Sequence, residues 1–419
     1  MSSELLSYEQ AGSLVADRAQ ALADQFTPRT ETIELASAGG RILAAPLLAD
    51  DDQPPFPRST RDGYACSAAD ASAHLELPVV GSTHAGEAPG GPLPAESAWE
   101  IMTGAPVPAG ADCVVMLEHV EKTGNAIRLS PSRSITAGDN IVERGAQARR
   151  GDQLLEAGVQ LGPAQIALAA SCGYSVLEVF ARPRVAILTT GDELVPVDAT
   201  PGPGKIRNSN ASMLAYLVAR AGGEPMVLPT AADRAEALDH ALARASVADM
   251  LLVSGGVSAG KYDLVEPALA RLGAQFHFTG VKIQPGKPLV FGEIHPVDKG
   301  GTTQVFFGLP GNPISSACTF LLFAAPILAA LGGSRETHPR FLLAQLSRDT
   351  DRRSKPGLTR FLPAYCTFNR SVNALPMVAT VAWHGSGDLT AFARSNCFLV
   401  IPEDESYLEA GSTVRILLH

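Results

Sequence analysis

The sequence predicts a multidomain protein of the α/β plus β class. We expect a three-layer α/β domain with a mostly parallel sheet, a β-rich domain, a discontinuous N-terminal linker domain and a C-terminal β-barrel-like domain. Three observations support this prediction. The chain has 419 residues, which exceeds what one ordinary hydrophobic core accommodates. Between residues 182 and 331, strand-like and helix-like segments alternate. On both sides of this region, short apolar runs lie between turn-forming residues.

The linker domain is predicted to consist of residues 1–49 and 147–181. An amphipathic helix should begin near the segment Ser7-Tyr8-Glu9-Gln10, which fits a capping box, and Pro28 should end it. The segment Gly151–Ala181 is mostly apolar with a helical period in its middle. We expect it to pack with the N-terminal helix, which makes the domain discontinuous in sequence.

Two further domains are predicted to be rich in short strands. Residues 50–146 have many turn signals and few helical periods, which indicates the β-rich domain. Residues 335–419 form a compact C-terminal β domain in this prediction. The runs that favour strands are Cys113–Leu117, Ala126–Leu129, Phe341–Leu346, Cys397–Ile401 and Thr413–Leu417.

The α/β domain is predicted to span residues 182–331. The alternation of strand-like and helix-like segments is the βα order that parallel sheets require. The expected elements are strands at Val185–Thr189, Met226–Leu228 and Met250–Ser254, and helices at Ala211–Ala221, Arg234–Ala245 and Leu264–Leu272.

Composition excludes several functional classes. The net charge is −10 and no basic run is long enough to follow a nucleic-acid backbone, so we expect no nucleic-acid partner. The six cysteines include no Cys-x-x-Cys pair, which argues against a disulfide framework or a structural zinc site. The N-terminus lacks the features of a signal peptide, and the longest apolar run, Phe320–Leu331, is interrupted by Pro326 and is too short to span a bilayer. These features predict a cytoplasmic protein without a membrane segment.

Three strand-like runs end in turns of small or rigid residues. The first stops at Thr-Thr-Gly and is followed by the carboxylates Asp192 and Glu193. The second ends at Gly255-Gly256, whose backbone N–H groups could hold an anion, and Asp263 beyond it could hold a cation. The third ends at Pro310-Gly311-Asn312-Pro313, where Asn312 can cap a helix. Because ligands bind beyond the carboxyl ends of parallel strands, these turns could meet at one crevice.

Six motifs are distributed over nearly the whole chain. They are Arg61-Asp62-Gly63-Tyr64-Ala65, Ile101-Met102-Thr103-Gly104-Ala105-Pro106-Val107-Pro108, Thr190-Gly191-Asp192-Glu193-Leu194, Ser254-Gly255-Gly256-Val257-Ser258, Pro285-Gly286-Lys287-Pro288 and Gly308-Leu309-Pro310-Gly311-Asn312-Pro313. In this order they resemble the motifs of the molybdopterin molybdenumtransferase family, the bacterial MoeA type that is related to the gephyrin E domain.

The resemblance implies a transferase of molybdenum cofactor biosynthesis. Such an enzyme takes adenylylated molybdopterin, inserts molybdate as a substrate into its dithiolene and releases AMP, with Mg²⁺ at the site. It also implies an elongated homodimer whose active site lies between the α/β domain of one subunit and the β-rich domain of the other. Transient contacts with a molybdopterin adenylyltransferase and with acceptor molybdoenzymes are expected as well.

Motif matching also implies roles for single residues. Glu193, Asp233 and Asp263 match metal-binding acids, and Glu193 and Asp263 are expected to act in catalysis. Bare carboxylates repel a pyrophosphate linkage, so a hard cation such as Mg²⁺ must bridge them. Asp62 and Thr103 match catalytic positions on the opposite, β-rich wall.

Further matched positions lie near the site expected for molybdate and the pterin. Lys287 is expected to be catalytic, because a lysine brings positive charge and hydrogen-bond donors to a tetrahedral oxyanion. The residues expected to bind the cofactor are Gly255, Gly256, Ser258, Pro288, Pro310, Gly311, Asn312, Ser315 and Ser386.

Several of these residues also have an ordinary structural interpretation. Asp233 could cap the helix that begins near Arg234, Asp62 could be a turn residue before Gly63, and Lys287 could be a solvated lysine.

The chain also departs from the family pattern. Arg144-Gly145-Ala146-Gln147 lacks two acids, Gln284 stands where lysine is common, and Pro363 stands where arginine is expected. These losses leave open a diverged, non-catalytic paralogue or scaffold that binds molybdopterin or partner proteins. A second alternative is a molybdopterin adenylyltransferase, because the α/β domain resembles those enzymes.

Overall fold

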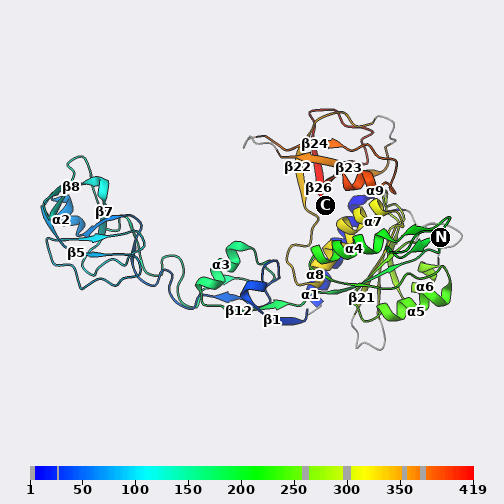
Figure 1. Cartoon of the computed structure of the whole chain (residues 1–419), viewed down its shortest axis with the longest axis horizontal. Helices are drawn as coiled ribbons and strands as arrows, with labels where there is room; N and C mark the ends of the chain where they lie inside the picture. Colours follow the sequence, from blue (N-terminus) through cyan, green and yellow to red (C-terminus); the bar gives the residue numbers. More distant parts are fainter. Residues whose placement is uncertain (1–4, 26–27, 257–263, 296–302, 352–355, 369–373) are drawn as a thin grey trace.

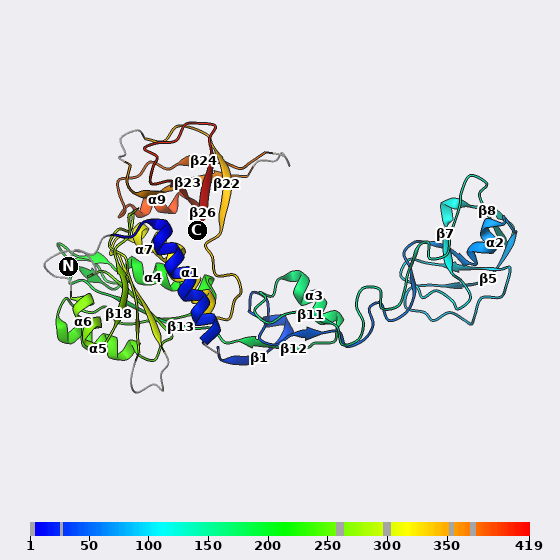
Figure 2. The same ribbon diagram turned by 180° about the vertical axis from the view of Figure 1, so that it is seen from behind.

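The computed structural model of the chain describes residues 5–25, 28–256, 264–295, 303–351, 356–368 and 374–419. The molecule is elongated (Figures 1 and 2), with a β-rich domain at one end and a small linker domain in the middle. The α/β and C-terminal domains lie together at the other end. The predicted fold class, an α/β domain combined with β domains, is therefore confirmed. The boundaries between the four domains stay predictions.

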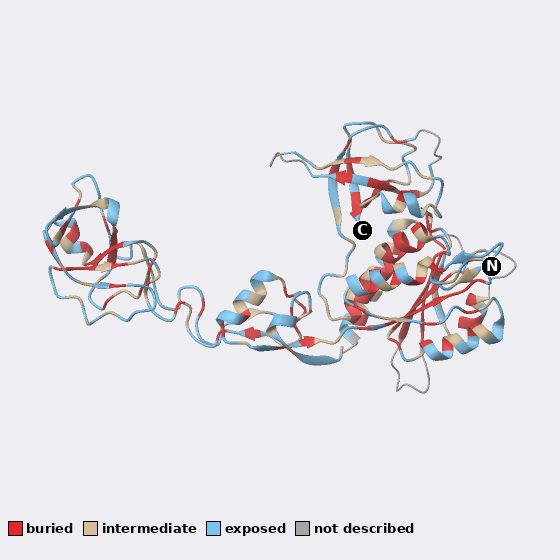
Figure 3. Ribbon diagram, in the orientation of Figure 1, coloured by how far each residue is buried: buried red, intermediate tan, exposed pale blue. Residues whose placement is uncertain are grey.

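The α/β domain has the three layers that the sequence predicts. Its elements are β13 (Arg184–Thr189), β14 (Leu194–Val195), β15 (Ile206–Arg207), α4 (Ser209–Arg220), β16 (Glu224–Val227), α5 (Ala235–Ala245), β17 (Met250–Ser254), α6 (Val265–Arg271), β18 (Gln275–Thr279), β20 (Val290–Ile294), β21 (Gln304–Leu309), α7 (Pro313–Thr319), the π-helical turn η4 (Phe320–Ala324) and α8 (Ala325–Leu331). The sheet order is β16-β13-β17-β21-β20-β18. The first four strands are parallel, and β20 is antiparallel to both of its neighbours. Apolar side chains of α4, α7 and α8 cover one face, and those of α5 and α6 cover the other. Buried residues therefore concentrate in this sheet and in α7 and α8 (Figure 3).

The N-terminal helix, α1 (Tyr8–Gln25), packs on the α/β domain and not on the linker domain. The predicted capping box is present: the Ser7 N–H donates to Gln10 Oε1 over 2.9 Å, and the Gln10 N–H donates to Ser7 Oγ over 3.2 Å. The buried stripe of the helix joins the core formed by α4, α7 and α8. The expectation that Gly151–Ala181 packs with this helix is therefore wrong. Periodicity identifies an apolar stripe, but not the surface that will cover it.

A continuous helical stretch runs from Pro313 to Leu331 through α7, η4 and α8. The helix is not interrupted at Pro326, and the expectation that the apolar stretch is too short to span a bilayer is wrong, because the helix begins at Pro313, before the apolar run. Because η4 is a π-helical turn directly before α8, the backbone is already widened where the proline, which has no N–H, enters the helix. Among the described residues this is the one stretch that is long and apolar enough to cross a membrane. Since 83% of its apolar window is buried inside the protein, it is a core helix.

The linker domain is formed from two separate stretches of the chain. β1 (Thr30–Glu34) pairs antiparallel with β12 (Val176–Phe180), and β2 (Leu47–Leu48) pairs with β11 (Gln153–Leu155). The helix α3 (Pro163–Ser171) packs on these strands. It also packs near the short 3₁₀ turn η1 (Leu35–Ser37), although the two elements are far apart in sequence. The chain leaves this domain for the β-rich domain and then returns to it.

The β-rich domain holds a six-stranded sheet in the order β7-β4-β6-β5-β9-β8. Its elements are β3 (Arg58–Ser59), β4 (Gly63–Cys66), α2 (Ala68–Ser72), β5 (Leu77–Thr83), β6 (Ala98–Ile101), β7 (Cys113–Met116), the 3₁₀ turn η2 (Leu117–His119), β8 (Val120–Thr123), β9 (Ala126–Leu129) and β10 (Ile141–Val142). Both predicted strands of this domain are present as β7 and β9. The β4 strand lies between β7 and β6 in the sheet. The turn that precedes β4 therefore lies at one end of the sheet.

The C-terminal domain is a closed five-stranded barrel. Its elements are β22 (Phe341–Leu346), β23 (Thr359–Thr367), β24 (Met377–Thr380), α9 (Leu389–Ala393), β25 (Cys397–Ile401) and β26 (Thr413–Leu418). The strands close in the order β22-β24-β23-β25-β26-β22. A short strand preceding β20 in the chain, β19 (Ile283–Gln284), adds in parallel to β23. This pairing joins the barrel to the α/β domain.

Candidate active site

One cavity lies at the carboxyl ends of the parallel strands. Its volume is about 850 Å³, within the usual range for small-molecule sites. The turns that follow β13, β17 and β21 line it together, as the sequence led us to expect, and α4 and the barrel complete its wall. The residues singled out from the sequence that line it are Glu193, Asp233, Gly255, Gly256, Pro288, Pro310, Gly311 and Asn312.

Carboxylates form one side of the cavity. Asp192 and Asp233 exchange two bonds: the Asp233 N–H donates to Asp192 Oδ1 over 3.2 Å, and the Asp192 N–H donates to Asp233 Oδ2 over 3.4 Å. Desolvation at the wall raises the pKa of Asp233, and the charges of Asp192 and Glu193 raise it further. The N-cap of α5 is Arg234, so the alternative interpretation of Asp233 as a helix cap is wrong. Asp263 lies outside the described residues.

The glycine turn after β17 is shaped by close packing. Gly255 has a φ of +97°, and a Cβ there would lie 2.6 Å from the carbonyl oxygen of Thr190. The Gly255 N–H donates to the carbonyl oxygen of Leu309 over 3.2 Å. The expectation that this N–H holds an anion is therefore wrong, because its one hydrogen is already used within the fold. Gly256 lines the cavity, while Ser258 lies outside the described residues.

The turn after β21 connects the cavity to the barrel. Asn312 occupies the N-cap position of α7, but its side chain does not cap the helix. Instead Asn312 Nδ2 donates to Ser386 Oγ over 2.9 Å, and the Ile314 N–H donates to the Ser386 carbonyl oxygen over 3.1 Å. The capping prediction is thus wrong, and the side chain links two domains at the cavity rim.

Three predicted residues lie near the cavity without lining it. Ser386 is held at the rim by Asn312. Ser315 is buried within α7, with 3% of its surface exposed. Lys287 is exposed to solvent and adjoins Pro288, which lines the cavity.

Asp62 and Thr103 lie together in the β-rich domain. Figure 1 shows this domain at the opposite end of the molecule from the α/β domain, whose strand ends form the cavity. Asp62 Oδ1 accepts from both the N–H and the hydroxyl of Thr103, each over 2.7 Å. These two bonds lower the pKa of Asp62 and keep it ionised. Both side chains are exposed, so the pair is available to a ligand or a neighbouring molecule. A single chain does not bring the pair to the cavity.

Sequence reasoning missed a polar network on the cavity floor. Asn208 caps α4 by accepting from the Ala211 N–H, and Asn210 Nδ2 donates to Ser254 Oγ over 2.9 Å and to the Gly311 carbonyl oxygen over 2.7 Å. Asn208 and Asn210 both line the cavity. The run of polar residues at the start of α4 was the available signal, but asparagines at a helix start usually serve only as caps.

A buried guanidinium lies where the family pattern loses positive charge. Arg360 is only 2% exposed and pairs in register with Gln284. Gln284 is one of the two positions at which this chain lacks the basic residue of the family pattern. The Nη2 of Arg360 donates to the carbonyl oxygens of Glu405 and Ser406. Desolvation lowers the pKa of Arg360. The other departure, Pro363, is buried in β23.

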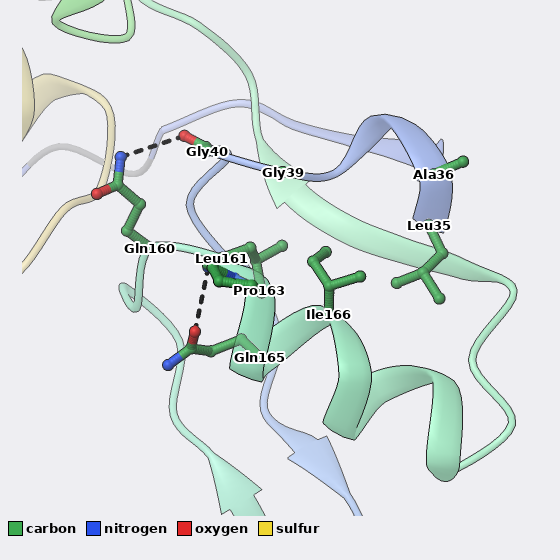
Figure 4. Close-up of a pocket in the computed structure, with 10 residues that line it drawn as sticks. Leu35, Ala36, Gly39, Gly40, Gln160, Leu161, Pro163, Gln165 and Ile166 are labelled. Carbon is green, nitrogen blue, oxygen red and sulfur yellow. Dashed lines mark hydrogen bonds between the residues drawn. The ribbon is translucent and has the colours of Figure 1, made fainter.

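A second hollow lies on the linker domain, away from the strand ends. Figure 4 shows Leu35, Pro163 and Ile166 around it, and its volume is about 580 Å³. Among the residues that line it there is no carboxylate, lysine or arginine. Its lining thus offers none of the charged groups found at the strand-end cavity.

Three family models match successive parts of the chain. The MoeA N-terminal region (domains I and II) matches residues 6–173, the probable molybdopterin binding domain matches 186–330, and the MoeA C-terminal region (domain IV) matches 345–419. Together they cover most of the chain.

Similar proteins match along nearly the whole length. The molybdopterin molybdenumtransferase of Nostoc sp. is 34% identical over 400 residues, which cover 93% of this chain and 88% of the relative. That of Bacillus subtilis is 35% identical over 406 residues, which cover 93% and 90%. The crystal structure of the molybdopterin biosynthesis moeA protein from Pyrococcus horikoshii aligns with a TM-score of 0.78 and 29% identity, over 99% of this chain and 100% of that one. The chain therefore belongs to the MoeA family of molybdopterin molybdenumtransferases.

Proposed function

We propose that this protein inserts molybdenum from molybdate into adenylylated molybdopterin and releases AMP. One observation carries the proposal: a chain that matches molybdopterin molybdenumtransferases over 93% of its length gathers Glu193, Asp233 and the Pro310–Asn312 turn around one cavity. Matches on both sides of the α/β domain favour this reaction over adenylyl transfer, which would need only the α/β domain.

The cavity suits an adenylylated pterin. Leu194, Ile206 and Leu389 provide apolar surface for planar rings, and the polar floor at Asn210 provides hydrogen-bonding groups. The carboxylates of Glu193 and Asp233 also line the cavity. We assign the pyrophosphate to these carboxylates and the molybdate to the rim near Lys287, Ser315 and Ser386.

Mg²⁺ is the cation that these carboxylates fit. Proteins usually bind Mg²⁺ through one or two carboxylates together with substrate phosphates, and Glu193 and Asp233 both line the cavity. Among the described residues, no group of three or more His, Cys, Asp or Glu side chains could hold a metal ion without such help. When bound, the ion would neutralise negative charge on the pyrophosphate. We keep Asp263 as a further proposed ligand.

A homodimer would complete the site. Asp62 and Thr103 belong to the β-rich domain and the cavity to the α/β domain, and these domains lie at opposite ends of the molecule (Figure 1). Two chains related by a two-fold axis and running in opposite directions would set each β-rich domain beside the partner's cavity. We further propose a cytoplasmic location, and transient contacts with a molybdopterin adenylyltransferase and with acceptor molybdoenzymes.

A cell-free assay tests the proposed reaction. The purified chain is incubated with adenylylated molybdopterin and Mg²⁺, with or without molybdate, and AMP is measured. We expect AMP release that depends on molybdate. Tight binding of the pterin without AMP release would favour the alternative of a non-catalytic paralogue or scaffold.

A further inference from the structure

Two polar atoms at the cavity are buried without a hydrogen-bond partner among the described residues. They are Thr190 Oγ1 and Asn210 Oδ1, and both residues line the cavity. Buried polar atoms in folded proteins are nearly always paired, so such atoms in a cavity point to a missing ligand. The two atoms differ in one respect: a hydroxyl can both donate and accept, whereas an amide oxygen can only accept.

The orientation of the Asn210 amide is fixed by its neighbours. The atom that lies 2.7 Å from the carbonyl oxygen of Gly311 must be Nδ2, because a carbonyl oxygen only accepts and an Oδ1 placed there would be repelled. The same Nδ2 also donates to Ser254 Oγ over 2.9 Å. One Nδ2 contact reaches the last residue of β17 and the other reaches the turn after β21, so the amide is anchored on two sides and Oδ1 is left as a fixed acceptor.

We infer that Asn210 Oδ1 accepts a hydrogen bond from a ring amino group of the substrate and thereby selects amino-bearing heterocycles. This inference rests on the proposed function, in which the substrate carries two such groups, one on adenine and one on the pterin. An analogue with a carbonyl oxygen in place of the amino group would set two acceptors against each other. A site built to pair a substrate N–H rejects analogues that lack it.

Ligand pairs that differ only in this group test the inference. AMP is compared with inosine monophosphate, and pterin with lumazine, by ligand-observed NMR titration of the full chain with Mg²⁺ present. We expect wild type to bind the amino member of one pair at least about tenfold more tightly than the oxo member. The pair that shows the preference identifies which half of the substrate faces Asn210.

Three variants separate the acceptor from the anchor. Asn210→Leu removes both and should abolish the preference. Asn210→Asp sets a carboxylate oxygen against the Gly311 carbonyl oxygen in place of Nδ2, so the side chain should lose its fixed orientation and the preference should weaken. Ser254→Ala removes one partner of Nδ2 and leaves Oδ1 in place, so the preference should be retained even if both affinities fall.

The outcomes distinguish this inference from the proposed function. Equal binding of the amino and oxo members to wild type would overturn the inference alone, as would an unchanged preference in a folded Asn210→Leu variant. Failure of wild type to bind any of the four probes would overturn the inference together with the proposed substrate. If the variants do not fold, the comparison of probes on wild type still decides.

Discussion

Neutralising the cavity carboxylates should stabilise the protein while it abolishes activity. In Asp233→Asn and Glu193→Gln, size and shape are kept but one negative charge is lost. The pKa of Asp233 is raised by desolvation and by its acidic neighbours, so the folded state disfavours its ionised form. The protonated carboxyl adds to the free energy of unfolding at low pH, and this contribution is lost as the pH rises through the folded-state pKa. Near neutral pH the wild-type protein therefore lacks it. Asp233→Asn removes this dependence of the free energy of unfolding on pH.

The size of the effect follows from the exposure of the group. Asp233 is solvent-exposed, and like-charge interactions at such positions amount to less than about 1 kcal/mol. For a domain of this size that corresponds to a rise in melting temperature of roughly 1 to 4 °C at neutral pH. The gain should shrink as the pH falls toward the ordinary pKa of 3.8. AMP release should fall about 100- to 1000-fold, the usual effect of losing one transition-state contact.

The assay measures melting temperature and AMP release on the same preparations between about pH 5 and 8. Asp192→Asn is the matched control, because Asp192 carries a like charge beside Asp233 but does not line the cavity. It should raise the melting temperature and leave AMP release nearly unchanged. Lower melting temperatures with near-normal AMP release in the Asp233 and Glu193 variants would refute the reasoning.

Three further predictions concern the rest of the site. Refolding a mixture of Asp62→Ala and Glu193→Ala chains should restore about a quarter of the wild-type rate, because half of the dimers are mixed and each of these contains one intact site. Thr103→Val removes one of the two donors to Asp62, so NMR titration should find the Asp62 pKa closer to its ordinary value. Gln284→Lys should lower the molybdate concentration needed for half-maximal AMP release, because it adds positive charge at an exposed position beside β23.

Each of these predictions has an outcome that contradicts it. No recovery in mixed dimers whose formation is verified would exclude a shared site. An unchanged Asp62 titration would mean that the backbone N–H of Thr103 alone sets the pKa. An equal or higher molybdate requirement in folded Gln284→Lys would argue that the lost lysine does not limit oxyanion binding.

The strand ends around the cavity could be predicted because their signals are local. A continuous apolar run followed by Thr-Thr-Gly or Pro-Gly-Asn-Pro indicates a buried strand and its turn within ten residues. The contact between Asp62 and Thr103 could not be read from a local pattern, because 41 residues separate them. Motif matching placed both residues on the β-rich wall of the site, but did not predict that they contact each other.

The partners of polar groups could not be predicted in the same way. Asn312 has the ideal position to cap α7, yet its amide donates to Ser386, which lies 74 residues away in another domain. The Gly255 N–H is taken by Leu309 of the adjacent parallel strand. Such choices depend on which atoms the tertiary fold brings together, and a local pattern carries no information about them. The covering surface of α1 was missed for the same reason.

The ratio of molybdenum inserted to AMP released is the most direct test of the account. Adenylylated molybdopterin and molybdate are incubated with the purified chain, and both AMP and the molybdenum bound to the pterin dithiolene are quantified. The account predicts one molybdenum inserted for each AMP released, and about 100- to 1000-fold less of both products when Glu193→Gln replaces the wild-type chain. AMP release without insertion of molybdenum, or insertion without AMP, would contradict it.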